Sequence, residues 1–152
     1  LAMRGIRTLN VRLQQHQTST LKIANWLSTR PEVETILHPA LPSCPGHEVF
    51  QRDFTGSNGL FSFVLNKGNQ AALTAFLDGM KHFKMGYSWG GFESLILGIS
   101  SVKNMRSATT WPYQFPLIRL HVGLENVDDL ISDLERGFSR FNQVLGQNND
   151  EG

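Results

Sequence analysis

The residue best suited to bind an anion is Arg119, in the middle of the strand-like segment PLIRLHVG, residues 116–123. Alternation along this segment predicts a strand with one apolar face and one face that carries charge. The first face holds Ile118, Leu120 and Val122, and the second holds Leu117, Arg119 and His121. A planar guanidinium can bind a carboxylate through two parallel hydrogen bonds. Two interpretations follow: Arg119 anchors an anionic substrate, or it is a partly exposed residue paired with Glu125 or an aspartate.

A glycine turn that carries a tryptophan is the second candidate. The stretch MGYSWGGFESLI, residues 85–96, contains Ser88 and Trp89 followed by two glycines. Glycines let the backbone turn tightly and let a ligand approach it, and an exposed indole offers a flat wall to a planar partner. The spacing matches neither the nucleotide-binding glycine motifs nor the G-x-S-x-G elbow of hydrolases. The alternative is a structural turn that packs one aromatic side chain.

The histidines and the cysteine give weaker signals. His121 shares a strand face with Arg119, but a single histidine is more often structural than functional. The five histidines, which show no metal-ligand spacing, are His16, His38, His47, His82 and His121. We therefore expect no metal site. Cys44 is the only cysteine and lies between proline-containing pairs, so we expect a turn thiol, no internal disulfide and a reducing cytosol.

Hydrophobic periodicity predicts the elements that must position these residues. Helices are expected at residues 1–27, ending before Pro31, at 70–80 with Asn69 as cap, and at 127–145 with Asn126 as cap. Strands are expected at 33–38, 60–66, 83–88 and 116–123, with a further apolar segment at 94–99 and one helical turn near Val49. This order indicates an α+β fold: a small, mainly antiparallel sheet with helices packed on one face. The other face is left to cover a site or a neighbouring domain.

The composition is that of one globular domain. The chain has 152 residues, 40% of them hydrophobic, and its 14 basic and 13 acidic residues give a net charge of +1 without charged runs. A chain of this length buries roughly two thirds of its unfolded surface, so neither a metal nor a disulfide is needed for stability. We expect a soluble, cytoplasmic protein that binds neither nucleic acid nor membrane, since no apolar run approaches the ~18 residues of a membrane span.

The first helix has no start signal. Its apolar pattern is already running at Leu1, and no capping residue comes before it. This observation favours a chain that has been cut from something longer.

Three separated segments resemble the trans-sulfuration enzymes, the Cys/Met metabolism family of pyridoxal phosphate (PLP) enzymes. They are residues 1–54 (LAMRGIRTLN to QRDF), 88–96 (SWGGFESLI) and 117–138 (LIRLHVGLENVDDLISDLERGF). The segments follow the family's order, and the resemblance covers nearly the whole chain. It implies the C-terminal domain of a fold-type I PLP enzyme, with residues 1–30 as a connecting helix, 31–146 as the small domain and 147–152 as a frayed tail.

The resemblance also implies roles for three residues. Arg119 matches the arginine that clamps the substrate α-carboxylate, and Ser88 and Trp89 match the loop that lines the carboxylate end of the pocket. A serine followed by tryptophan is similar to the β-lyase branch of the family, which cleaves the Cβ–S bond of L-cystathionine to give homocysteine, pyruvate and ammonia. A leucine after the serine is more typical of the γ-synthases and γ-lyases, which stay the alternative.

The family's Schiff-base lysine has no match in this chain. That lysine lies in a Ser-x-Thr-Lys setting, which none of the five lysines has: Lys22, Lys67, Lys81, Lys84 and Lys103. The resemblance therefore implies that PLP is bound by a missing N-terminal cofactor domain of a homo-oligomeric parent. We expect no catalytic residue and no bound cofactor in this fragment, and no activity from it alone. Two other hypotheses are a stand-alone amino-acid-binding module and an interaction domain that self-associates through an exposed apolar face.

Overall fold

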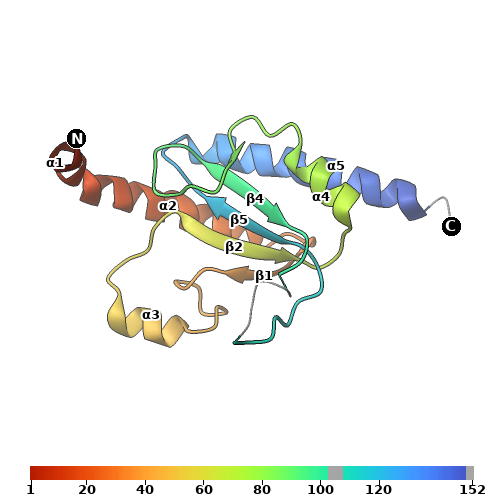
Figure 1. Ribbon diagram of the computed structural model, residues 1–152, viewed down its shortest axis with the longest axis horizontal. Coiled ribbons are helices and arrows are strands. Elements are labelled where there is room, and N and C mark those ends of the chain that lie inside the picture. Colours follow the sequence, from red (N-terminus) through yellow and green to blue (C-terminus); the bar gives the residue numbers. More distant parts are fainter. Residues whose placement is uncertain (103–107, 150–152) are drawn as a thin grey trace.

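The computed structural model describes residues 1–102 and 108–149, which form five helices and five strands (Figure 1). In chain order these are α1 (Ala2–Ile6), α2 (Leu9–Leu27), β1 (Val33–Leu37), α3 (His47–Asp53), β2 (Leu60–Leu65), α4 (Gln70–Leu77), β3 (Lys84–Met85), β4 (Leu95–Ile99), β5 (Leu117–His121) and α5 (Val127–Asn149). Lys103 lies outside the described residues.

The strands form one mixed sheet in the order β1-β2-β5-β4-β3. Three of its four pairings are antiparallel, and only β3 and β4 run parallel. The expected mainly antiparallel sheet is therefore confirmed. β5 lies at its centre, with Arg119 paired to Ser62 of β2 on one side and to Leu97 of β4 on the other. The candidate anion-binding residue thus stands on the most strongly supported strand of the sheet.

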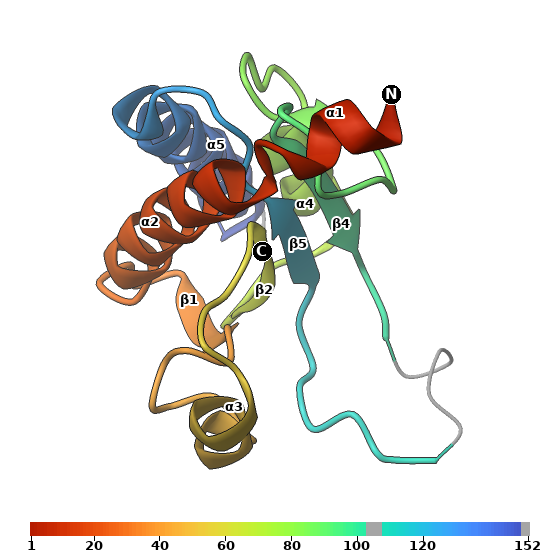
Figure 2. The ribbon, with the colours of Figure 1, turned by 90° about the vertical axis from the view of Figure 1, so that its left-hand side faces the viewer.

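Helices α2, α4 and α5 cover one face of this sheet and form the core with it, and Figure 2 shows α2 and α5 side by side on that face. The apolar side chains at the centre of this core are fully or almost fully buried. They include Ile23, Leu27, Phe63, Phe76, Ile118, Leu120, Leu134, Phe138 and Phe141. Phe76 meets Phe138 edge to face, with ring centroids 4.9 Å apart. The predicted apolar face of β5 is therefore confirmed as the face that packs on the helices.

The predicted helix caps are also present. The Asn69 side chain accepts a hydrogen bond from the Ala72 N–H at 2.9 Å, and the Asn126 side chain accepts one from the Asp128 N–H at 2.8 Å. These bonds satisfy N–H groups that have no partner inside the helix. α5 continues to Asn149, three residues into the tail 147–152 that was expected to fray.

Two further elements differ from the expectation. The N-terminal helix is divided, because the backbone leaves helical geometry between α1 and α2. Arg12 and Thr8 stabilise this break: the Arg12 Nη2 donates to the Gly5 carbonyl at 3.0 Å, and the Thr8 hydroxyl donates to the same oxygen at 3.3 Å. The apolar segment 94–99, to which no type was assigned, contains strand β4.

The opposite face of the sheet is open only in part. A small apolar cluster covers the end where β5 begins, and its buried members are Val64, Val102 and Leu117, with Trp111 and Tyr113 packed against them. Arg119 lies further along the same face. None of the described helices is long and apolar enough to span a membrane.

Candidate functional site

Arg119 binds the first residues of the loop that carries Trp89. We call residues 86–94 the tryptophan loop. The Nη2 of Arg119 donates to the Tyr87 carbonyl at 2.8 Å, to the Gly86 carbonyl at 3.3 Å and to the Ser88 carbonyl at 3.5 Å. The structure therefore brings Arg119 and Ser88 together, as the sequence interpretation required.

The positive charge of Arg119 has no counterion in the described part of the chain. Glu125, the partner suggested by the surface-pairing interpretation, binds Ser94 instead. Backbone carbonyls orient the guanidinium but carry no net charge, and its Nε and Nη1 have no partner among the described residues. Arg119 is half-buried. A half-buried guanidinium with two unused donor groups is well suited to receive a carboxylate.

His121 holds the second part of the same loop. Its Nε2 lies 3.0 Å from the Gly91 carbonyl oxygen, and the Gly90 nitrogen, whose N–H points at the ring, lies 3.1 Å from Nε2 and 3.3 Å from Nδ1. One neutral tautomer satisfies both contacts: Nε2–H donates to Gly91, and Nδ1 accepts from Gly90. Burial is the main cause that lowers the pKa of His121 below its usual 6.5. Sequence reasoning assigned His121 no role beyond the strand face that it shares with Arg119.

The last part of the loop is fixed by the residues that follow β5. The Glu125 carboxylate accepts from the backbone N–H and the hydroxyl of Ser94, both at 2.7 Å. The Ser94 hydroxyl in turn accepts from the Gly123 N–H at 2.8 Å, and the Leu124 N–H donates to the Phe92 carbonyl at 2.8 Å. The single segment 119–125 thus binds the tryptophan loop along most of its length.

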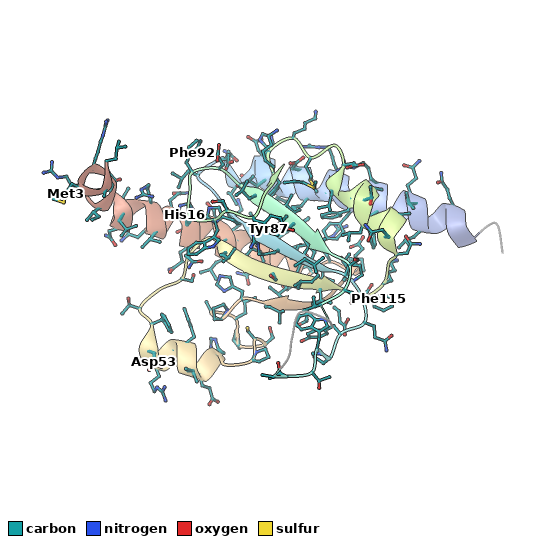
Figure 3. The ribbon with its side chains drawn as sticks, in the orientation of Figure 1. Met3, His16, Asp53, Tyr87, Phe92 and Phe115 are labelled. Atoms are coloured by element: carbon teal, nitrogen blue, oxygen red, sulfur yellow. The ribbon has the colours of Figure 1, made fainter. Side chains whose placement is uncertain are left out.

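The large side chains of this loop point away from the core. Tyr87, Trp89 and Phe92 are 84%, 60% and 69% exposed, and Figure 3 labels Tyr87 and Phe92 on the loop. The alternative of a turn that packs one aromatic side chain is therefore wrong. Gly90 has a φ of +83°, a conformation that glycine adopts without strain, and this permits the turn directly after Trp89.

A cavity of about 210 Å³ separates this loop from the first half of α2. Its wall includes Leu9, Leu13 and His16 of α2, together with Trp89, Gly90 and His121. A larger cavity of about 610 Å³ lies against α3, is lined mainly by apolar residues, and includes neither Ser88, Trp89 nor Arg119. Of the three candidate residues, only Trp89 lines the smaller cavity; Ser88 and Arg119 line neither cavity and are linked to Trp89 through the tryptophan loop.

The described residues do not fit PLP. Its Schiff base needs an amine inside the site, but Lys22 pairs with Asp128, the Lys84 amine donates to the Lys81 carbonyl, and no described lysine lines the cavity beside Trp89. Burial raises the pKa of the Cys44 thiol, which disfavours its reactive thiolate. The described residues also contain no group of three potential metal ligands.

Comparison with known proteins identifies the family to which this fold belongs. The family model described as "Cys/Met metabolism PLP-dependent enzyme" matches residues 1–139. The cystathionine β-lyase of Haemophilus influenzae is 55% identical over 141 residues, which is 91% of this chain and 36% of that protein. The cystathionine β-lyase of Salmonella typhimurium is 53% identical, over 93% of this chain and 36% of that protein.

A solved structure supports the same relationship. The cystathionine γ-synthase of Xanthomonas oryzae pv. oryzae, solved in complex with aminoacrylate and cysteine, superposes with a TM-score of 0.78 and 35% identity. The match covers 92% of this chain and 37% of that one. The chain therefore belongs to the Cys/Met metabolism family of PLP-dependent enzymes. Within that family it is homologous to the C-terminal region of bacterial cystathionine β-lyases, and it spans about a third of their length.

Proposed function

We propose that this chain is the substrate-capping domain of a PLP-dependent carbon–sulfur lyase, in which Arg119 binds the α-carboxylate of cystathionine. The observation that carries the proposal is the half-buried guanidinium, which has no counterion among the described residues and is held against the loop that presents Ser88 and the exposed Trp89. A guanidinium without an ion-pair partner, together with an exposed aromatic ring on the adjoining loop, is the combination expected of an amino-acid-binding site.

The chemical contribution of these residues is orientation. Bidentate binding of the carboxylate by Arg119 would fix the Cα of the substrate, and Trp89 would exclude water from one side of it. PLP would be bound by the part of the enzyme that these residues do not include. We therefore propose that the chain alone does not turn over substrate and that a complete site needs both parts.

The β-lyase reaction is the first choice for the parent enzyme. The high identity to cystathionine β-lyases over nearly the whole chain supports it. Cystathionine γ-synthase or γ-lyase activity is the alternative, because the same fold occurs in a γ-synthase structure. Product analysis separates these reactions, since the β-lyase forms pyruvate and homocysteine.

The test is a steady-state assay of the parent enzyme with L-cystathionine, with wild type compared with Arg119→Ala and Arg119→Lys. Loss of a desolvated charge pair costs about 3 kcal/mol or more, so kcat/KM should fall by at least ~100-fold in Arg119→Ala. Arg119→Lys should recover only part of this loss, because an ammonium lacks the planar fork. The control is Arg52→Ala, which removes an exposed arginine of α3 paired with Asp53 and should leave kcat/KM unchanged.

The 152-residue chain itself tests the proposal that it does not contain a complete substrate site. Calorimetry with cystathionine should show binding at millimolar strength or weaker, because the cofactor side of the pocket is absent. Micromolar binding would instead favour a stand-alone amino-acid-binding module. An unchanged kcat/KM in Arg119→Ala would remove Arg119 from the site.

A further inference from the structure

We propose that His121 is a positioning residue that holds the Trp89–Gly90–Gly91 turn as a neutral imidazole, so that protonation of His121 releases this wall of the site. The substrate-binding consequence rests on the proposed function. The attachment of the turn to His121 rests on the contacts below and can be tested without activity.

The two hydrogen bonds of His121 require opposite roles from its two nitrogens. The Gly91 carbonyl can only accept, and the Gly90 N–H can only donate. A neutral imidazole with its proton on Nε2 meets both needs, whereas an imidazolium has two N–H groups and no acceptor. The Gly90 nitrogen lies near both ring nitrogens, so protonation would leave its N–H facing a ring without any acceptor and break one of the two bonds.

The ring cannot turn to avoid this conflict, because it is packed on both sides. His16 of α2 lies against it with ring centroids 5.3 Å apart. A Cβ on Gly59 would lie only 2.9 Å from its Cε1 and 3.0 Å from its Nδ1. This close packing restricts the rotation of the ring. His121 is 2% exposed, and its ring lines the cavity beside α2.

The charged groups around His121 favour the neutral form on balance. His16 and Arg119 disfavour a further positive charge, and Arg12 of α2 lines the same cavity. Glu125 favours the charged form, but its two oxygens already accept hydrogen bonds from Ser94. The pKa of His121 lies below 6.5, with burial as the largest cause. The turn should therefore be held at neutral pH and released as the pH falls through this lowered pKa.

His16, which is part of α2, packs against the ring of His121. Its Nδ1 donates to the Val122 carbonyl at 2.7 Å, which links α2 to the residue that follows β5. The two histidines, the end of β5 and the turn thus form one packed unit beside the cavity. In this arrangement, a change in the charge of one ring would act directly on the hydrogen bonds that hold the turn.

The primary experiment is an NMR titration of the isotopically labelled 152-residue chain from pH 8 to pH 4.5. In wild type, the Gly90 amide and the Trp89 indole N–H should shift together with the His121 imidazole, with one midpoint below 6.5. The Phe83 amide, which donates to Asp133, is the internal reference and should not follow this midpoint. Resonances of Gly90 and Trp89 that stay in place while His121 titrates would overturn the proposal.

Two variants separate positioning from simple packing. His121→Gln supplies an amide donor and a carbonyl acceptor that do not titrate, so the Gly90 and Trp89 shifts should lose their pH dependence. His121→Leu keeps the volume but neither hydrogen bond, so the Gly90 amide should lose its protection from exchange at every pH. His47→Gln is the control, because His47 contacts Pro39 and not the turn. If His121→Leu does not fold, the wild-type and His121→Gln titrations still decide the question.

The parent enzyme gives the functional readout. KM for cystathionine should rise as the pH falls below 6.5 in wild type, and His121→Gln should lose the part of this rise that follows the His121 midpoint. A rise in KM with the same midpoint in both proteins would overturn the link to substrate binding. An enzyme with no lyase activity would overturn the proposed function alone, because the NMR titration would still report on the turn.

Discussion

At the scale of single residues, the site is built by small groups that permit close contact more than by the large side chains exposed on it. Gly123 shows this most clearly. A Cβ at this position would lie 2.2 Å from the Phe92 carbonyl oxygen and 2.7 Å from the Glu93 carbonyl carbon. Both atoms belong to backbone, so they cannot give way as a flexible side chain could. The tryptophan loop can lie against the end of β5 only because residue 123 has no side chain.

Gly123→Ala is therefore expected to destabilise the chain by about 1–3 kcal/mol, the usual scale for overpacking a close contact. The measurement is the midpoint of urea unfolding. Gly146→Ala is the matched control: nothing lies within 4 Å of its Cβ, and it is part of α5. Because alanine favours a helix over glycine, that variant should gain up to ~1 kcal/mol. Equal effects of the two substitutions would contradict the close-contact argument.

At the scale of elements, α5 does more than bury an apolar face, because it also anchors the turn that leads into β3. The fully buried Asp133 accepts hydrogen bonds from the backbone N–H groups of Lys81, His82 and Phe83, and Arg136 donates to it at 3.1 Å. Burial acts to raise the pKa of Asp133, but these hydrogen bonds outweigh it and lower the pKa below 3.8. The Asp133 carboxylate thus links α5 to the residues that precede strand β3.

Asp133→Asn should lower the free energy of unfolding by about 2 kcal/mol at pH 7, because an amide NH₂ would face backbone donors. Asp129→Asn, on the exposed side of the same helix, should cost less than about 1 kcal/mol. The stability that depends on Asp133 is present above pH 3.8 and is lost as the pH falls through its lowered pKa. Urea unfolding between pH 7 and pH 3 measures both effects. A penalty for Asp133→Asn that does not shrink in acid would contradict this origin.

At the scale of the whole molecule, the N-terminal residues stand apart from the core. α1 buries none of its residues, and Figure 3 shows Met3 at one end of the molecule, beyond the edge of the sheet. Met3 and Ile6 are 71% and 64% exposed, and Leu1 and Leu9 are exposed as well. The N-terminal residues therefore carry an exposed apolar surface.

We expect the 152-residue chain to self-associate through these N-terminal residues at micromolar concentrations, because exposed apolar surface of this kind is usually covered by a partner. Light scattering over a concentration series measures the mass. The variant Met3→Ser/Ile6→Ser should shift the series towards the monomer, whereas Val49→Ser, an exposed apolar residue of α3, should not. A wild-type chain that stays monomeric over the whole series would contradict the prediction.

Sequence reasoning found the parts of this fold that repeat a simple pattern. Arg119 could be identified because side chains alternate between the two faces of a strand, so a charged residue must lie on the face opposite the buried apolar one. Helix α5 could be identified because its apolar spacing extends over five turns. Strand β4 could not be assigned, since a run of six mostly apolar residues fits a strand or a buried helix segment equally well. The role of His121 depends on backbone groups some 30 residues away, and no local spacing carries that information.

The way the tryptophan loop is attached has a consequence for how such enzymes could diversify. The hydrogen bonds that fix the loop run to its backbone or to Ser94, whereas the side chains of Tyr87, Trp89 and Phe92 are largely exposed. New side chains at these three positions would alter the shape and polarity of the recognition surface at little thermodynamic cost. One rigid frame could in this way serve different sulfur-containing substrates.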